Sequence, residues 1–95
     1  MKRDWLFGEP QPIQACIRCV SEATGITVAQ ITGESRRAAI VKARHAAMYL
    51  AHRQFGKSST QIGIAFGGRD HTTVIAAVRN VEARPHLYPL IEVSE

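Results

Sequence analysis

The chain has 95 residues, 45% of them hydrophobic and 21% charged, which is typical of one globular domain with a single modest core. No run of apolar residues approaches the roughly 20 that a helix needs to cross a membrane. The first ten residues, with Lys, Arg, Asp and Glu among them, do not resemble a secretory signal. We therefore expect a cytoplasmic protein with no membrane contact.

The charge is unevenly distributed along the chain. The formal net charge is +4, and seven of the twelve Lys and Arg residues fall between positions 35 and 69, a span without Asp or Glu. The other positions hold five basic and eight acidic residues. A solvated basic surface is the simpler interpretation, but a span without acids favours a polyanion partner, and nucleic acid before others.

The N-terminal third predicts an arm followed by two helices. Residues 1–9 are expected to form the arm. Apolar residues at three- and four-residue steps predict a helix over 11–23 that ends at Gly25. Thr27 can cap a short helical segment that Gly33 closes.

Cys16 and Cys19 have the C-x2-C spacing of zinc and redox sites. No second cysteine pair is present, and the four histidines are scattered. Because both cysteines fall within the apolar helical repeat, we interpret them as buried core residues. We expect no metal site and no cofactor.

A basic loop over 34–37 and a long helix over 38–55 follow. The helix should bury one apolar side, to which we assign Phe55. Arg44 falls in the middle of this apolar stripe, where a guanidinium without a partner is costly. We expect its head group to reach a charge at the edge of the stripe, either Asp70 or a DNA phosphate.

The next segment predicts a helix-turn-helix. Ser58 and Gln61 form a capping box for a short first helix. Gly67 and Gly68 allow a tight turn, and Asp70 can cap the second helix. The second helix should bury a stripe of small apolar residues: Val74, Ala77, Val78 and Val81.

These elements predict an all-α fold, a single domain of about five or six helices. The apolar tail is expected to fold back on the core. We divide the domain, residues 1–95, into an N-terminal arm (1–9), N-terminal helices (10–33), the basic loop with the long helix and the helix-turn-helix (34–84), and a C-terminal tail (85–95).

The run FGGRDHTTV, residues 66–74, resembles the signature of the C-terminal DNA-binding domain of DnaA, the bacterial chromosomal replication initiator. Similar residues continue upstream through Ile62-Gly63 and 47–50 to Arg36, so that the resemblance covers roughly residues 26–82. It implies a Trp-repressor-like bundle whose recognition helix enters the major groove of a short DNA box.

The resemblance also implies roles for single residues. Asp70, His71 and Thr72 match residues that contact bases, and Arg36 matches an arginine that reads the adjacent minor groove. The phosphate contacts that we expect comprise three residues matched to the family, Arg44, Arg69 and Thr73, and five others, Arg37, Lys42, His45, Lys57 and Ser59.

Some residues depart from the family pattern. Glu34 stands where a loop lysine is usual, Ala38 replaces a basic residue, and the usual Pro-Arg-Gln reads Ala43-Arg44-His45. These changes remove positive charge beside the minor groove. The chain also lacks the G-x-x-x-x-G-K-[ST] of an ATPase, so we expect no nucleotide binding and either a free-standing DNA-binding protein or a domain excised from an initiator. The native-like start, Met1-Lys2-Arg3-Asp4-Trp5, favours the free-standing protein.

The leading functional hypothesis is sequence-specific binding of double-stranded DNA at a DnaA-box-like site, in bacterial transcription regulation or control of replication initiation, at the nucleoid. The alternative is an interaction module that kept the fold but lost specific DNA binding, with a protein partner at Trp5, Phe7 or the C-terminal tail. The neighbouring pair Asp70-His71 suggests acid–base chemistry, but no nucleophile or metal ligand is expected to converge on it, and we do not expect an enzyme.

Overall fold

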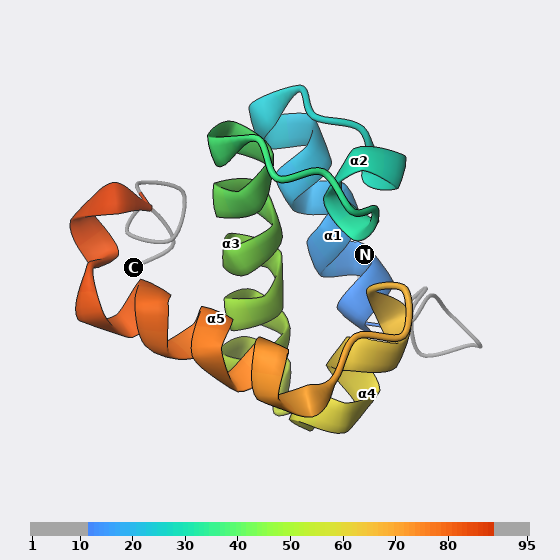
Figure 1. Ribbon diagram of the computed structural model, residues 1–95, viewed down its shortest axis with the longest axis vertical. Coiled ribbons are helices and arrows are strands. Elements are labelled where there is room, and N and C mark those ends of the chain that lie inside the picture. The colour runs from blue at the N-terminus through green and yellow to red at the C-terminus, as the bar shows by residue number, and fades with distance from the viewer. Residues whose placement is uncertain (1–11, 89–95) are drawn as a thin grey trace, which may run out of the picture.

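A computed structural model describes residues 12–88 of the chain, and it is helical throughout, with no strand in that range. The prediction of an all-α fold is confirmed. In Figure 1, α3 runs through the middle of the molecule, α1 packs along one side, α5 crosses the other, and α4 closes the lower end. The elements in chain order are α1 (Pro12–Thr24), α2 (Val28–Thr32), α3 (Ala38–Phe55), α4 (Ser59–Ala65), α5 (His71–Ala83) and the short 3-10 helix η2 (Pro85–Leu87).

The central position of α3 follows from its alanines. Ala43, Ala46, Ala47 and Ala51 are all buried, and their small side chains let neighbouring helices approach the α3 backbone closely. Larger apolar side chains from the surrounding helices fill the space between them. Those that are fully buried include Ile17, Val20, Ile31, Ile62, Phe66, Val74 and Val81, and Met48 of α3 itself is also fully buried.

The predicted caps of the two short helices are confirmed. The Thr27 hydroxyl accepts a 3.0 Å hydrogen bond from the Gln30 backbone N–H, and the Gln30 side chain accepts one of 3.0 Å from the Thr27 N–H. Ser58 and Gln61 make the same reciprocal pair at 3.1 Å. Helices of five and seven residues are too short to be stable alone. The caps satisfy N–H groups that their first turns leave free.

Two predicted core residues lie at the surface. Phe55 is 45% exposed because it is the last residue of α3, and the buried residues of that helix end at Ala51. Cys19 is exposed whereas Cys16 is buried. The buried stripe of α1 is narrow and consists of Ile13, Cys16, Ile17 and Val20, and Cys19 lies outside it.

The chain returns to the core after α5. Tyr88 is buried against Ala46 and Val81, so the start of the C-terminal tail folds back as expected. The rest of the tail, and the arm with Trp5 and Phe7, lie outside the described residues. Within the described range, no helix combines the length and the apolar character that a membrane span requires.

Candidate nucleic-acid interface

The turn between α4 and α5 depends on glycine at three positions. Gly67 and Gly68 have φ of +85° and +79°, a conformation that residues with a side chain rarely adopt. Gly63, within α4, lies against the backbone of the turn, and a Cβ there would be 2.2 Å from the Arg69 carbonyl oxygen. The Arg69 N–H donates a 2.8 Å bond to the Gly63 carbonyl. This close contact fixes the direction in which α5 leaves the turn.

Because α5 leaves the glycine turn in this direction, the first turn of the helix faces solvent. Its buried stripe is the predicted one, comprising Val74, Ala77, Val78 and Val81. The core holds that stripe, and the residues at the start of the helix are therefore presented together at the surface. Asp70, His71, Thr72 and Thr73 are all exposed.

Asp70 is the N-cap residue of α5 as predicted, but its carboxylate makes no capping hydrogen bond with the helix. Instead, Thr72 Oγ1 donates a 2.9 Å bond to one carboxylate oxygen, and His71 Nδ1 lies 3.1 Å from the other. The bond from Thr72 is the main cause that lowers the pKa of Asp70 below its usual value. The carboxylate is therefore ionised at neutral pH and is an acceptor for N–H donors.

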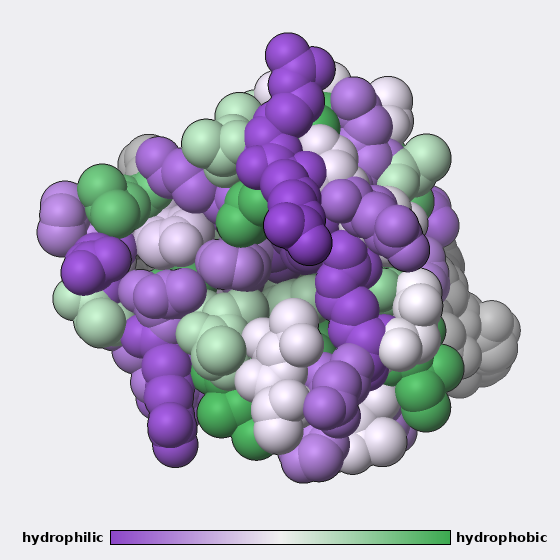
Figure 2. Space-filling view, in the orientation of Figure 1, coloured by the Kyte–Doolittle hydropathy of each residue, from purple (hydrophilic) through white to green (hydrophobic). Residues whose placement is uncertain are grey.

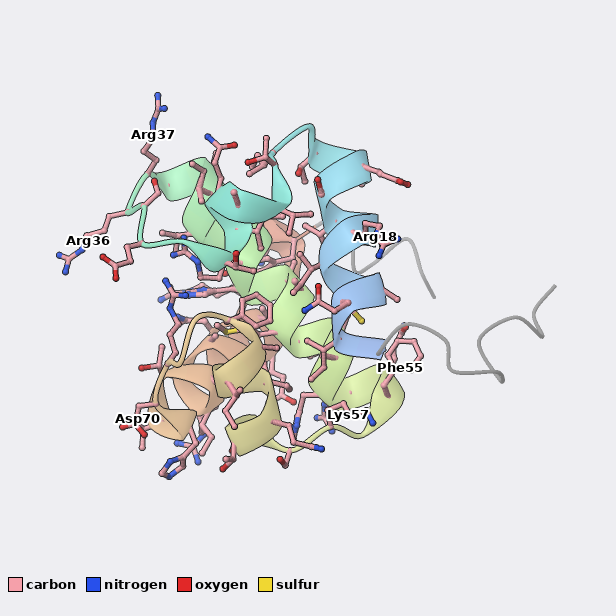
Figure 3. All side chains as sticks on the ribbon, turned by 90° about the vertical axis from the view of Figure 1, so that its right-hand side faces the viewer. Arg18, Arg36, Arg37, Phe55, Lys57 and Asp70 are labelled. Atoms are coloured by element: carbon pink, nitrogen blue, oxygen red, sulfur yellow. The ribbon has the colours of Figure 1, made fainter. Side chains whose placement is uncertain are left out.

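The basic loop between α2 and α3 lies on the same side of the molecule as the start of α5. Arg36 and Arg37 are exposed, and Figure 3 shows both pointing away from the body on the side where Asp70 lies. The face seen in Figure 2 carries a band of hydrophilic side chains that runs from this loop toward the start of α5. The structure thus places Arg36, Arg37 and the first turn of α5 on one side of the molecule.

Arg44 does not pair with an acid among residues 12–88. Its side chain is buried, with 6% of the residue exposed. Its Nε donates a 2.7 Å bond to the Ile31 carbonyl, and one terminal nitrogen donates a 3.2 Å bond to the Gln30 carbonyl. The prediction that Arg44 pairs with Asp70 is wrong, because its guanidinium donates to backbone carbonyls at the end of α2 instead. With its guanidinium bonded in this way, Arg44 is not assigned to a phosphate.

Arg69 is engaged in the same way. One terminal nitrogen donates to the carbonyls of Phe66, at 2.6 Å, and Thr32, at 3.2 Å, while the other donates to the Gly33 carbonyl. Its guanidinium therefore points into the protein between α4 and the end of α2. We also leave Arg69 out of the proposed phosphate contacts.

Two further predicted phosphate contacts lie away from the start of α5. In Figure 3, Lys57 lies toward the opposite side of the molecule from Asp70. Lys42 lines an apolar groove with Ala39, Ala43 and Tyr88 and thus lies near η2, beyond the far end of α5. Neither position follows from the local sequence, since both depend on how α3 packs.

His45 is half-buried on α3. Burial is the main cause that lowers its pKa below 6.5, and the charge of Arg44 adds to the effect. The imidazole is therefore mostly neutral at neutral pH and supplies little charge for a phosphate. Among residues 12–88, its buried Nδ1 has no hydrogen-bond partner.

A groove beside α5 includes one predicted phosphate contact, Ser59, and one further residue, Arg79, that was not among the contacts predicted from the sequence. Ser59, at the start of α4, lines it together with Val74 and Ile75 of the first two turns of α5. Arg79, two turns after Thr72 on the exposed side of α5, also lines it. The seven-residue spacing from Thr72 is the signal that could have identified Arg79.

In the described part of the chain, the C-x2-C pair does not belong to a cluster of metal ligands. Burial, and to a lesser extent the neighbouring Cys19, raises the pKa of the Cys16 thiol to about 11. In the range 12–88, no group of three or more His, Cys, Asp or Glu side chains is placed to hold a metal ion.

The sequence of this chain is similar to those of a known protein family. Residues 13–81 match the bacterial DnaA protein helix-turn-helix family. The chain is 54% identical over 63 residues to the chromosomal replication initiator protein DnaA of Mycoplasma capricolum, a match that covers 66% of this chain and 14% of that protein. It is 46% identical over 66 residues to the protein of the same name from Caulobacter sp. strain K31, covering 70% and 14% of the two chains. For that of Thermodesulfovibrio yellowstonii, the identity is 40% over 82 residues, covering 84% and 19%.

The matched region is thus most of this chain but only a small part of each relative. The chain spans 14% of the length of the first relatives that it matches. No solved structure is similar at a significant level. Because the family match covers 69 of the 95 residues, from 13 to 81, the chain belongs to the bacterial DnaA helix-turn-helix family.

Proposed function

We propose that this chain binds double-stranded DNA sequence-specifically, with α5 as the recognition helix. The observation that carries the proposal is the exposed first turn of α5, where Asp70, His71 and Thr72 stand clear of a helix whose opposite face is held in the core. In a major groove, an ionised carboxylate accepts from cytosine N4, and hydroxyl and imidazole groups pair with several base edges. A recognition helix that enters by its N-terminal end presents these groups first.

The basic loop adds a second contact to the same duplex. Arg36 and Arg37 are exposed on the side where α5 begins. We assign Arg36 to the adjacent minor groove, where the narrow shape concentrates negative potential that attracts arginine. Arg37, Ser59 and Thr73 are assigned to phosphates beside the two grooves, and Arg79 joins them from the second half of α5.

The site that we expect resembles the box of the family's initiators. The relatives carry the name chromosomal replication initiator protein, and this chain matches a small part of each. We assign the chain to control of replication initiation or to transcription regulation, by occupation of such a site. The alternative, a protein-interaction module, predicts weak and salt-insensitive binding of DNA.

A salt titration separates the two functions. A duplex selected by the wild-type protein from a random pool is titrated at increasing NaCl concentrations. Each Lys or Arg paired with a phosphate contributes about 0.9 to the slope of log affinity against log salt. Arg37→Ala is therefore expected to reduce the slope by about 0.9, whereas Lys57→Ala, on the opposite side of the protein, should leave it unchanged. A wild-type affinity that does not change with salt would exclude the proposed function.

A further inference from the structure

We propose that Arg69 and Arg44 form a clamp on the end of α2 that positions the loop of Arg36 relative to the recognition helix. The inference rests on the proposed function and assigns positioning roles to two arginines that the sequence suggested as phosphate contacts. The clamp consists of these two side chains and the four consecutive carbonyls of Gln30, Ile31, Thr32 and Gly33.

The four carbonyls lie at the end of a short helix, and that of Gln30 also accepts a 3.3 Å bond from the Gly33 backbone N–H. α2 has five residues, so the carbonyls of its last turn have few helical N–H groups to accept from. Arg44 donates to Ile31 at 2.7 Å and to Gln30 at 3.2 Å. Arg69 donates to Thr32 at 3.2 Å and to Gly33. The negative end of a helix dipole favours cations at this position.

Arg69 connects the two DNA-reading elements directly. It immediately precedes Asp70, and one of its acceptors, Gly33, immediately precedes the loop over 34–37. It also donates a 2.6 Å bond to the carbonyl of Phe66, where α4 ends. A single guanidinium, on the residue that precedes the N-cap of α5, therefore ties the end of α2 to the end of α4.

The glycine turn packs against the same place. A Cβ on Gly67 would be 3.1 Å from the Thr32 carbonyl oxygen, so the backbone of the turn lies close to the end of α2. The arrangement brings two like charges together, and the pKa of Arg44 is lowered first by its burial and then by the charge of Arg69. The hydrogen bonds that the two guanidinium groups donate to the four carbonyls offset this repulsion.

The clamp increases affinity by alignment rather than by contact with DNA. If the loop were free to move relative to α5, only a fraction of molecules would present Arg36 to the minor groove when α5 enters the major groove. Apparent affinity falls in proportion to that fraction. A planar guanidinium donates to several acceptors at fixed angles, whereas a lysine ammonium with the same charge cannot reproduce that geometry.

A double-mutant cycle tests the clamp on the duplex selected by the wild type. Affinities are measured for wild type, Arg36→Ala, Arg69→Lys and the double variant, after circular dichroism has shown that each is folded. We expect Arg69→Lys to weaken binding about tenfold although the charge is kept. We expect Arg36→Ala to cost about tenfold in the wild type and less than about twofold in the Arg69→Lys background.

Failure of the clamp and failure of the proposed function give different results in this experiment. A direct phosphate contact by Arg69 predicts that lysine largely preserves binding and that the two losses add, and either result overturns the clamp. If the wild type shows no preference for the selected duplex, the proposed function fails first. If wild type and Arg36→Ala behave as expected but the losses are additive, only the clamp fails. Should Arg69→Lys not fold, Arg69→Gln and Arg44→Lys are measured in its place, with the same non-additivity expected.

Discussion

Replacement of Gly63 by alanine tests the packing that orients the recognition helix. The new Cβ would lie 2.2 Å from the Arg69 carbonyl oxygen, about 1.2 Å short of the 3.4 Å at which ordinary contact begins. The obstacle is backbone, so no side chain can rotate away to relieve it. Relief requires α4 and the turn to separate, which stretches the 2.8 Å bond from the Arg69 N–H to the Gly63 carbonyl.

The cost follows from three contributions. Overpacking of this kind costs about 1–3 kcal/mol, and loss of the hydrogen bond adds about 1 kcal/mol. Alanine is favoured over glycine inside a helix by about 0.5–1 kcal/mol, which offsets part of the cost. We expect Gly63→Ala to lower the free energy of unfolding by about 2 kcal/mol, equivalent to a fall in Tm of about 10 °C for a domain of this size.

Urea unfolding followed by circular dichroism measures this change. Gly25→Ala is the control, because that residue has φ of +80° and a Cβ added there would meet no atom within 4 Å, so it reports the cost of the left-handed conformation alone. A Gly63→Ala protein as stable as the wild type, or more stable, would show that α4 and the turn are not packed as described, since alanine without a clash stabilises a helix.

Two further predictions concern titratable groups. A chromogenic disulfide reagent at pH 8 should label Cys19 in the folded protein and Cys16 only after unfolding, because Cys16 is buried and its pKa is raised to about 11; equal rates for both thiols would contradict this. The pKa of His45 is lowered below 6.5 in the folded state, mainly by burial, so the unfolded chain binds the proton more readily and stability is lost as pH falls below 6.5 toward the folded pKa. Urea midpoints between pH 7 and pH 5 should therefore fall less in His45→Gln than in the wild type, and identical pH profiles would refute the assignment.

The helices and their caps could be predicted because they depend on nearby residues. The stripe of Val74, Ala77, Val78 and Val81 fixes both the helix and its buried face. The capping box of Ser58 is likewise contained within four residues. The resemblance of residues 66–74 to the DnaA signature also predicted the family. The match over residues 13–81 confirms it.

The arginines could not be placed from the sequence. Arg44 was expected to seek an opposite charge, but its partners are backbone carbonyls of Ile31 and Gln30. Carbonyls occur at every residue, so no pattern of side chains identifies those that a short helix leaves free. The side on which Lys57 lies depends on the angle at which α4 leaves α3, which is set by packing and not by local spacing.

Base reading by α5 is the central claim, and a paired titration tests it most directly. Wild type, His71→Ala and His86→Ala are titrated with the selected duplex and with a scrambled duplex of the same composition. His86 is also exposed, but it lies in η2, beyond the far end of α5, and it controls for the loss of a histidine. We predict that His71→Ala reduces the ratio of the two affinities by about 5- to 150-fold, equivalent to about 1–3 kcal/mol, and that His86→Ala leaves it unchanged. A ratio that is the same in His71→Ala and in the wild type would contradict the assignment of α5 as the base-reading helix.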